Sequence, residues 1–448
     1  MNKPLYEKPI ISKLAPGVAN KFGHRLAAPV TESIEGIPIR DLIDAHGSPL
    51  FVFVENKLRR QYRDLHAAMT LRYPKIKLAW SYKTNYLGAV CRVFHDEGAW
   101  AEVVSDFEYK RAIALGQHRS EIIYNGPYKS RSSLEEAVSN GTIINIDHYD
   151  EMQVLEDIAR QQETEPAVGL RVNLSTGFTP HWDRFGFNFE NGQAMTAAER
   201  IRSRGVLRLA GLHCHIGTFV LEADAYRSAA QKLSELANQI GKELGITLDY
   251  LDLGGGFASR NTLHSQYLPG DEVSPSFQEY SNAIVEGLDH LDNNENKPTL
   301  ILETGRALVD DAGYLLTSVV ATKRLEDGRR AIVLDAGTNL LPTSAWYRHD
   351  IFPASECQGG PEPTAVLGPL CMQIDILREN MMLPPLTKGD LMVFKRVGAY
   401  NVSQWTQFIT LRPAVVMISP DGEVHVIRKS ETLDDVTGRE EIPSHLSS

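Results

Sequence analysis

The stretch "LAWSYKTNY" (residues 78–86) places Lys83 directly after an apolar, strand-like run and directly before polar residues. Most lysines at strand ends simply extend into solvent. In a parallel barrel, however, the carboxyl ends of all strands meet at one mouth, and a lysine there belongs to a site. The fold of the surrounding chain therefore decides what Lys83 can do.

The run that ends at Lys83 is the first of eight similar apolar runs that alternate with amphipathic stretches. The eight runs are 77–83, 100–106, 121–126, 142–148, 167–173, 209–217, 250–256 and 299–305. Between the runs the pattern is helical: in 55–72 the apolar residues Leu58, Tyr62, Leu65 and Met69 share one face. In 131–141 a serine, Ser132, stands three residues before Glu135 and predicts the start of another helix.

Eight strand–helix units predict a (β/α)8 barrel over residues 57–310. A doubly wound open sheet is the alternative, and it is less favoured because no G-x-G-x-x-G opens the series. After residue 310 the residue pattern changes to short β-type runs separated by turns. This pattern predicts a C-terminal β domain over 311–430. The run "PLFVFV" (49–54) is assigned to that domain, so segment 1–56 contributes to it, and 431–448 is a tail. The predicted fold class is α/β.

Composition narrows the class of protein. The 448 residues carry a formal net charge of −11, whereas a nucleic-acid surface needs a basic stripe. The four cysteines form no CxxC pair or zinc spacing, so neither a disulfide framework nor a metal site is predicted. The sequence contains no apolar run of about 18 residues, so no membrane span is predicted. The N-terminus also lacks the apolar region of a signal peptide, so a cytoplasmic protein is expected.

Polar residues at the eight strand ends are the candidates for a site at the barrel mouth. They are Lys83, Ser105, Asp106, Asn125, Asp147, Arg171, Asn173, His213, His215, Gly254, Gly255, Gly256, Glu303 and Arg306. The glycines of "GGG" (254–256) and "ETGR" (303–306) end the last two strands, where barrels often bind a phosphate. Lys83 and Glu303 lie on the first and last strands, which are neighbours in a closed barrel. Of the two histidines, only one is expected to face inward.

A lysine, a carboxylate, an imidazole and an anion site together suit pyridoxal phosphate. The chain resembles the fold-type III pyridoxal-phosphate-dependent decarboxylases of the diaminopimelate and ornithine decarboxylase group. The resemblance covers about residues 35–430 and rests on "YKTN", "EVVS", "GLHCHIGT", "LDLGGGF", "ETGR", "GPLC" and "GAYNVS", in that order. It implies an alanine-racemase-like TIM barrel followed by a β domain, and usually a homodimer.

The resemblance also implies a role for each matching residue. Lys83 would hold the cofactor as a Schiff base, His215 would stack on its ring, and Glu303 would pair with the ring nitrogen. The phosphate would be held by Gly254, Gly255, Gly256, Thr218, Gly305 and Arg306. Cys371, Asp375 and Tyr400 lie in the β-domain motifs, and the Cys371 loop would come from the partner subunit and supply a proton. Arg171, Met372 and Asp375 are the expected contacts to the substrate. Burial is expected to lower the pKa of Lys83.

The chain departs from the family pattern where the family reads its substrate. The family's "SGGEL" is "SDFEY" here, so Asp106 and Phe107 replace small residues. Met372 stands where diaminopimelate decarboxylases carry a glutamate, and the stretch 338–344 lacks their arginine. The resemblance therefore implies decarboxylation of an amino acid or a derived metabolite other than diaminopimelate, as in siderophore or antibiotic pathways.

Two other functions are compatible with a barrel of this type. An amino-acid racemase usually places an arginine against the ring nitrogen, whereas this chain offers Glu303. A non-catalytic binding relative would have lost the lysine or the phosphate residues, and these are present. The decarboxylase is therefore the favoured hypothesis.

Overall fold

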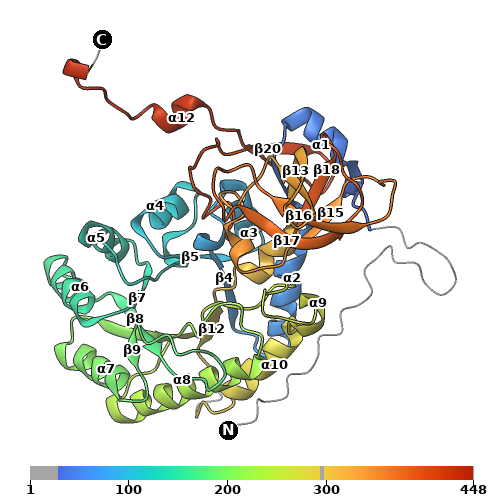
Figure 1. The fold of residues 1–448 in the computed structure, drawn as a ribbon. Helices are drawn as coiled ribbons and strands as arrows, with labels where there is room; N and C mark the ends of the chain where they lie inside the picture. The colour runs from blue at the N-terminus through green and yellow to red at the C-terminus, as the bar shows by residue number, and fades with distance from the viewer. Residues whose placement is uncertain (1–28, 293–296, 447–448) are drawn as a thin grey trace, which may run out of the picture.

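The computed structural model describes residues 29–292 and 297–446 of the chain. Eight parallel strands close into a barrel, because β12 pairs with β4 at one seam and β10 pairs with both β8 and β11 (Figure 1). The strands are β4 (Ile76–Ser81), β5 (Trp100–Val103), β6 (Ile122–Tyr124), β7 (Ile143–Ile146), β8 (Ala167–Asn173), β10 (Arg208–His213), β11 (Tyr250–Asp252) and β12 (Thr299–Leu302). The predicted barrel is confirmed, and the open-sheet alternative is wrong.

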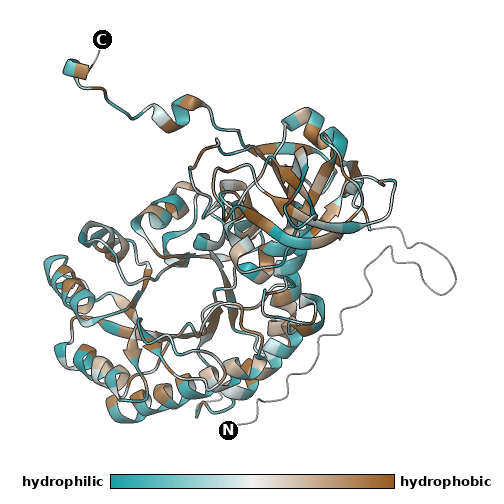
Figure 2. Cartoon of the chain, in the orientation of Figure 1, coloured by the Kyte–Doolittle hydropathy of each residue, from teal (hydrophilic) through white to brown (hydrophobic). Residues whose placement is uncertain are grey.

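Helices surround the barrel and turn their polar faces outward, as the teal outer ring of Figure 2 shows. The longer ones are α2 (Glu55–Thr70), α3 (Gly88–Asp96), α4 (Asp106–Ala114), α5 (Arg131–Ser139), α6 (Tyr149–Gln161), α7 (Gln193–Arg204), α8 (Ala223–Leu244) and α10 (Phe277–Leu288). The apolar face predicted for α2 is buried at all four positions. The predicted start of α5 is wrong: Ser130, not Ser132, caps it by accepting a hydrogen bond from the Ser133 backbone. None of the helices in the described ranges is both long and apolar enough to cross a membrane.

A second sheet forms the β domain beside the barrel (Figure 1). Its strands are β3 (Leu50–Val54), β13 (Gly313–Arg324), β14 (Arg330–Leu334), β15 (Asp350–Pro353), β16 (Glu362–Leu367), β17 (Ile376–Leu383), β18 (Leu391–Lys395), β19 (Val415–Ile418) and β20 (Val424–Arg428). The early strand β3 pairs antiparallel with β13 and parallel with β19, so residues 50–54 belong to this sheet.

Smaller elements flank the two sheets. They are β1 (Ser33–Ile34), β2 (Ile37–Pro38), α1 (Ile39–His46), β9 (Phe187–Asn188), α9 (Gly270–Val273), α11 (Arg306–Val309) and α12 (Leu433–Thr437). The first 28 residues of the predicted N-terminal segment and the last two of the tail lie outside the described residues.

Candidate active site

A cavity of about 320 Å³ opens at the carboxyl ends of the barrel strands. Twelve of the predicted site residues line it, namely Lys83, Asn125, Arg171, His213, His215, Thr218, Gly255, Gly256, Glu303, Gly305, Arg306 and Tyr400. The other lining residues are Ser81, Thr84, Glu102, Val104, Gly126, Pro127, Trp182 and Phe185. We call this space the first cavity. It contains the charged groups from which a reaction site can be built.

Lys83 projects into the first cavity from a single 3-10 turn, η1 (Tyr82–Thr84), that follows strand β4. Its Nζ lies 2.5 Å from Oε2 of Glu102, which also accepts the Ser81 hydroxyl at 2.7 Å. Burial alone would lower the pKa of Lys83, but the carboxylates of Glu102 and Glu303 outweigh it and raise that pKa above its ordinary value. The expectation of a lowered pKa is therefore wrong, because it left Glu102 out.

Glu303 ends strand β12 and is buried at the floor of the cavity. Asn125 donates to Oε1 of Glu303 at 2.5 Å and to Oε1 of Glu102 at 3.2 Å, so one side-chain amide bridges the two carboxylates. Nε2 of His213 lies 3.3 Å from the other oxygen of Glu303. Burial opposes ionisation of Glu303, but His213 and Lys83 outweigh it and hold its pKa well below the usual range. Glu303 is therefore an anion at any physiological pH.

Asp252, on the neighbouring strand β11, is neutral, whereas Glu303 is charged. Burial, followed by the negative charge of Glu303, raises the pKa of Asp252 well above its ordinary value, so this carboxyl keeps its proton. Ligand atoms of His213, Asp252 and Glu303 lie within 4.8 Å of one another, which is close enough to hold a metal ion. The sequence spacing predicted no metal. We assign the three groups to the polar network under Lys83, because Glu303 already accepts the Asn125 amide.

His215 provides a neutral, flat ring at the side of the cavity. Its Nδ1 accepts the backbone N–H of Gly255 at 3.1 Å, which leaves the ring proton on Nε2. Burial and the charges of Lys83 and Arg171 lower the pKa of His215 to about 3. The expectation that only one histidine faces inward is wrong. Residues two apart in a strand point to the same side, so both histidines can face inward, and both rings line the cavity.

The glycines form a wall that side chains could not occupy. A Cβ at Gly255 would lie 2.4 Å from the carbonyl oxygen of Glu303, and one at Gly256 would lie 2.3 Å from that of Gly217. At Gly305 a Cβ would meet the Thr84 hydroxyl at 2.1 Å. The absence of side chains lets a ligand approach the backbone closely. Gly254 packs behind this wall, since a Cβ there would meet the Cys214 carbonyl at 2.6 Å.

Arg306 supplies unpaired cationic donors beside the glycine wall. Its Nη2 donates to the Thr218 hydroxyl at 3.0 Å, while its Nε and Nη1 are buried and have no partner among the described residues. Buried donors of this kind are normally satisfied, so these two are available to an anion. Lysine, carboxylate, flat imidazole, glycine wall and free donors together fit pyridoxal phosphate.

Arg171 lines the cavity opposite this wall. Its guanidinium lies 3.5 Å from Asp147 and stacks over the Phe185 ring at 4.3 Å. Asp106 and Phe107, the departures near the mouth, do not line the first cavity in the described part of the chain. Asp106 accepts the Tyr124 hydroxyl at 2.6 Å, and Phe107 packs edge-on against Tyr86.

Tyr400 reaches the first cavity from the β domain. Its backbone N–H donates to the Thr84 carbonyl at 2.9 Å, and its ring lies 4.6 Å from the Arg306 guanidinium. Its backbone is left-handed, with φ of 61°. Non-glycine residues rarely adopt this conformation, so the surrounding contacts must hold it.

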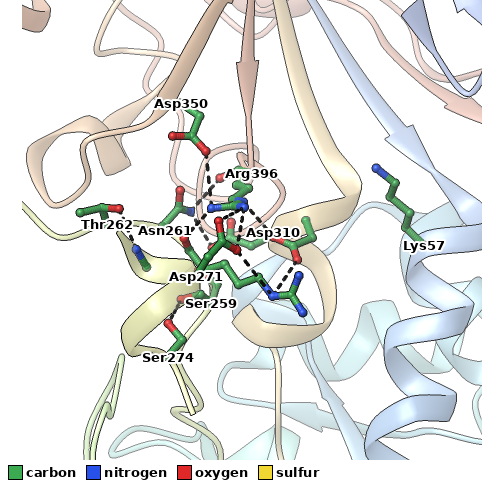
Figure 3. A network of polar contacts seen from close by, with 12 residues as sticks. Lys57, Ser259, Asn261, Thr262, Asp271, Ser274, Asp310, Asp350 and Arg396 are labelled. Carbon is green, nitrogen blue, oxygen red and sulfur yellow. Dashed lines mark hydrogen bonds and ion pairs between the residues drawn. The ribbon is translucent and has the colours of Figure 1, made fainter. Parts of the chain in front are cut away.

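A polar network at the domain junction fixes the segment that carries Tyr400 (Figure 3). Arg396 joins the two domains through ion pairs with Asp271 at 2.7 Å and Asp350 at 3.4 Å. Asp310 accepts the backbone N–H of Ala399 at 3.0 Å and the Ser259 hydroxyl at 2.5 Å. The network therefore ties the residue before Tyr400 to the barrel.

The remaining predicted residues, Cys371, Met372 and Asp375, do not line the first cavity of their own chain within the described residues. Cys371 is exposed on the loop between β16 and β17. Asp375 is buried there, and its carboxylate accepts the backbone N–H groups of Thr338 and Leu370, each at 2.8 Å. These hydrogen bonds use the Asp375 carboxylate to hold the conformation of the loop. The role of the loop at a partner's site stays a prediction.

Several lining residues had no predicted role, above all Glu102, and also Ser81, Trp182 and Phe185. A signal existed for Glu102, because it is a charged residue inside the apolar run "WAEVV" (100–104). A buried charge in a strand indicates a partner. Trp182 and Phe185 lie between β8 and β9, where no periodicity marks them.

Comparison with known proteins agrees with this geometry. Residues 55–310, more than half of the chain, match the family model described as "Pyridoxal-dependent decarboxylase, pyridoxal binding domain". The chain is 29% identical to a diaminopimelate decarboxylase of Methanothermobacter thermautotrophicus, over 95% of this chain and 98% of that protein. It is 30% identical to one of Corynebacterium efficiens, over 91% of each.

A crystal structure of the diaminopimelate decarboxylase of Methanocaldococcus jannaschii superposes with a TM-score of 0.85. It is 25% identical, and the match covers 94% of this chain and 98% of that one. The β domain and the barrel are therefore both shared. The chain belongs to the pyridoxal-dependent decarboxylases, the fold-type III carboxy-lyases that use pyridoxal phosphate.

Proposed function

We propose that this protein decarboxylates an amino acid, or an amino-acid-derived metabolite, at the first cavity. The observation that carries the proposal is that Lys83 and a buried, anionic Glu303 line the same cavity, each just after one of two neighbouring barrel strands. Pyridoxal phosphate, when bound, accepts the electron pair that remains on the substrate's α-carbon after CO2 leaves. The relatives named as diaminopimelate decarboxylases support the same reaction class.

Each residue then has a definite task in the proposed reaction. Lys83 would hold the cofactor covalently, and its amine lies beside Glu102. Glu303 would keep the cofactor's ring nitrogen protonated, because its own pKa is too low to take that proton. His215 is neutral and flat, so it packs on a ring without adding charge.

The phosphate end is assigned to the wall of Gly255, Gly256 and Gly305, with Thr218 and Arg306 beside it. The backbone can approach an anion there, and Arg306 offers two unpaired donors. Arg171 and Trp182 close the cavity on the substrate side and exclude water from the reacting carbon.

We further propose that diaminopimelate is not the preferred substrate. Diaminopimelate carries an ammonium and a carboxylate at its far end, and both need a partner once water is removed. Met372 offers no counter-charge where the resembling family has a glutamate, and 338–344 contains no arginine. A metabolite of a siderophore- or antibiotic-type pathway, made in the cytoplasm, fits these departures.

The protein is proposed to act as a homodimer with shared sites. Cys371 is exposed and lies outside the first cavity of its own chain. In a dimer the same loop can complete the neighbour's site and bring the thiol to the α-carbon as a proton donor. Mixing inactive Lys83→Ala and inactive Cys371→Ala subunits is then expected to restore activity. Continued inactivity after proven subunit exchange would mean that each site is self-contained.

The test of the proposed function is a CO2-release screen on the purified, cofactor-loaded protein over L-amino acids, diamino acids and their acylated forms. The Lys83→Ala variant is expected to lose both CO2 release and the long-wavelength absorption of the bound cofactor. Lys77→Ala, an exposed lysine on the same strand, is the matched control and should behave as wild type. Racemisation of a substrate without CO2 release would favour the racemase alternative instead.

A further inference from the structure

A second cavity, of about 580 Å³, adjoins the first. Thr218, Arg306 and Tyr400 line both, so the two spaces meet at this shared wall. The second cavity alone is lined by Phe219, Leu263, His264, Ser265, Ala345, Trp346, Tyr347 and Gln404. Its size lies in the range of cavities that hold small organic molecules. The chemistry assigned to Lys83 and Glu303 makes no use of this space.

Aromatic rings and hydrogen-bond donors form the walls of the second cavity. The Arg306 guanidinium lies over the rings of Phe219, Tyr347 and Tyr400, at 5.5, 5.4 and 4.6 Å from their centroids. The Tyr347 hydroxyl is buried and has no partner among the described residues, whereas the unpaired Nε and Nη1 of Arg306 are assigned to the phosphate in the first cavity. His264, Ser265 and Gln404 add polar side chains at the rim. Unpaired buried donors select a ligand with acceptor oxygens.

The walls also discriminate against positive charge. Among the described residues, no aspartate or glutamate lines the second cavity. An ammonium group placed there would lose its water without gaining a counter-charge, and it would face the Arg306 cation. A free diamino acid is therefore a poor occupant. An acylated one has lost this charge and gained a carbonyl oxygen in its place.

We propose that the second cavity binds the far end of the substrate, and that this end is an acylated amino group with no positive charge. An acceptor oxygen of the acyl group meets the Tyr347 hydroxyl, and its planar amide packs on the aromatic rings. The inference rests on the proposed decarboxylation, because the amino-acid end must lie in the first cavity. It names the substrate class as Nω-acylated diamino acids.

The experiment compares L-lysine with Nε-acetyl- and Nε-succinyl-L-lysine, and L-ornithine with its Nδ-acyl forms, on the cofactor-loaded protein. CO2 release gives kcat/KM, and calorimetry gives the Kd of each ligand independently of turnover. The acyl forms are expected to exceed the free diamino acids by at least about tenfold in kcat/KM and to bind more tightly. A preference for succinyl over acetyl would show that the terminal carboxylate is the acceptor that meets the Tyr347 hydroxyl, and equal values would show that the amide oxygen is.

Filling the second cavity tests where the acyl group lies. Ala345 lines this cavity alone and is exposed at its rim, so Ala345→Trp can narrow it without disturbing the core. We expect Ala345→Trp to lower kcat/KM and binding for acyl substrates by about tenfold, with cofactor affinity unchanged. Ala67→Trp, at an exposed alanine on α2, is the control for an added tryptophan.

Two failures can be told apart. Faster turnover of free diamino acids, or equal loss of acyl binding in Ala345→Trp and Ala67→Trp, would overturn the assignment of the second cavity while leaving decarboxylation intact. If acyl ligands bind to the wild type and not to Ala345→Trp, but no compound releases CO2, the proposed reaction is overturned instead.

Discussion

The two cavities that meet at Arg306 differ in how their charges are arranged. In the first, both acidic groups that line the walls have partners: Glu102 faces Lys83, and Glu303 faces His213 and Asn125. In the second, no acidic group among the described residues lines the walls, and the buried Tyr347 hydroxyl is unpaired. A site with paired charges is already arranged for one reaction. A site with unpaired donors is arranged for a ligand that brings the acceptors.

This difference suggests why relatives can share a reaction without sharing a substrate. The paired network is built from strand ends of the barrel, which also match the resembling family's motifs. The second cavity combines the loop after β11 with the β-domain segment 345–347. Loops and domain edges change more freely than strand ends.

The strongest test of the first cavity is removal of the Glu303 charge. Glu303→Gln keeps the shape and the Asn125 contact region but cannot hold a positive ring nitrogen, so kcat should fall about a thousandfold with cofactor still bound. Steady-state kinetics and the cofactor spectrum measure the two effects. Glu108→Gln is the control, since Glu108 is buried nearby and lines neither cavity. Wild-type turnover in Glu303→Gln would refute the role of Glu303.

The lining of the second cavity predicts a poor reaction with meso-diaminopimelate. Its far end needs a counter-charge for an ammonium group, and the walls supply none. We expect kcat/KM to be at least about a hundredfold below that of the best acylated substrate, because an unpaired charge is costly to bury. Parallel CO2-release assays measure the ratio. Efficient conversion of diaminopimelate to lysine would contradict this prediction and the argument from Met372.

The pairing of Lys83 with Glu102 predicts a change in the pH dependence of cofactor capture. A lysine must be neutral to react, and Glu102 helps to raise the pKa of Lys83. Glu102→Gln should therefore move the midpoint for cofactor binding to lower pH by at least about one unit. Stopped-flow absorption over a pH series measures this shift, with Glu136→Gln, at an exposed position on α5, as the control. An unchanged midpoint would separate Glu102 from the chemistry of Lys83.

The smallest predicted effect lies at the domain junction. Burial raises the pKa of Asp310 from 3.8 to about 6. The folded state therefore holds this proton more tightly than the unfolded state, and the resulting stability is present below about pH 4 and lost as the pH rises through about 6. The unfolding free energy of wild type relative to Asp310→Asn should fall over this window, by at most about 3 kcal/mol.

Urea denaturation at several pH values measures the Asp310 effect. Asp64→Asn, at an exposed position on α2, is the control and should show no such window. A wild-type advantage that grows as the pH rises from about 4 to about 6 would contradict the raised pKa of Asp310.

Much of the barrel site followed from the sequence because its residues are periodic. Lys83 and Glu303 end apolar runs, and a closed barrel places the ends of the first and last runs side by side. Glu102 lies one residue before the end of β5, and Asp252 is the last residue of β11. Which way each side chain points depends on the register of the strands, which the sequence does not state.

Other features depend on contacts between distant segments. β17 was not predicted, because it is an edge strand whose run "ILRENMML" carries polar residues that reach solvent. The second cavity joins Leu263 to Tyr347 across the domain junction, and no local pattern links these positions. The raised pKa of Lys83 likewise required knowing that Glu102 faces it.

The measurement that tests the central claim most directly is covalent trapping of the cofactor. The purified protein is mixed with pyridoxal phosphate, reduced with borohydride and digested, and the labelled peptide is located by mass spectrometry. The account predicts one pyridoxyl group per chain, on the peptide containing Lys83, and none in Lys83→Ala. Label on a different lysine, or no label while CO2 release persists, would contradict the assignment of this cavity as the active site.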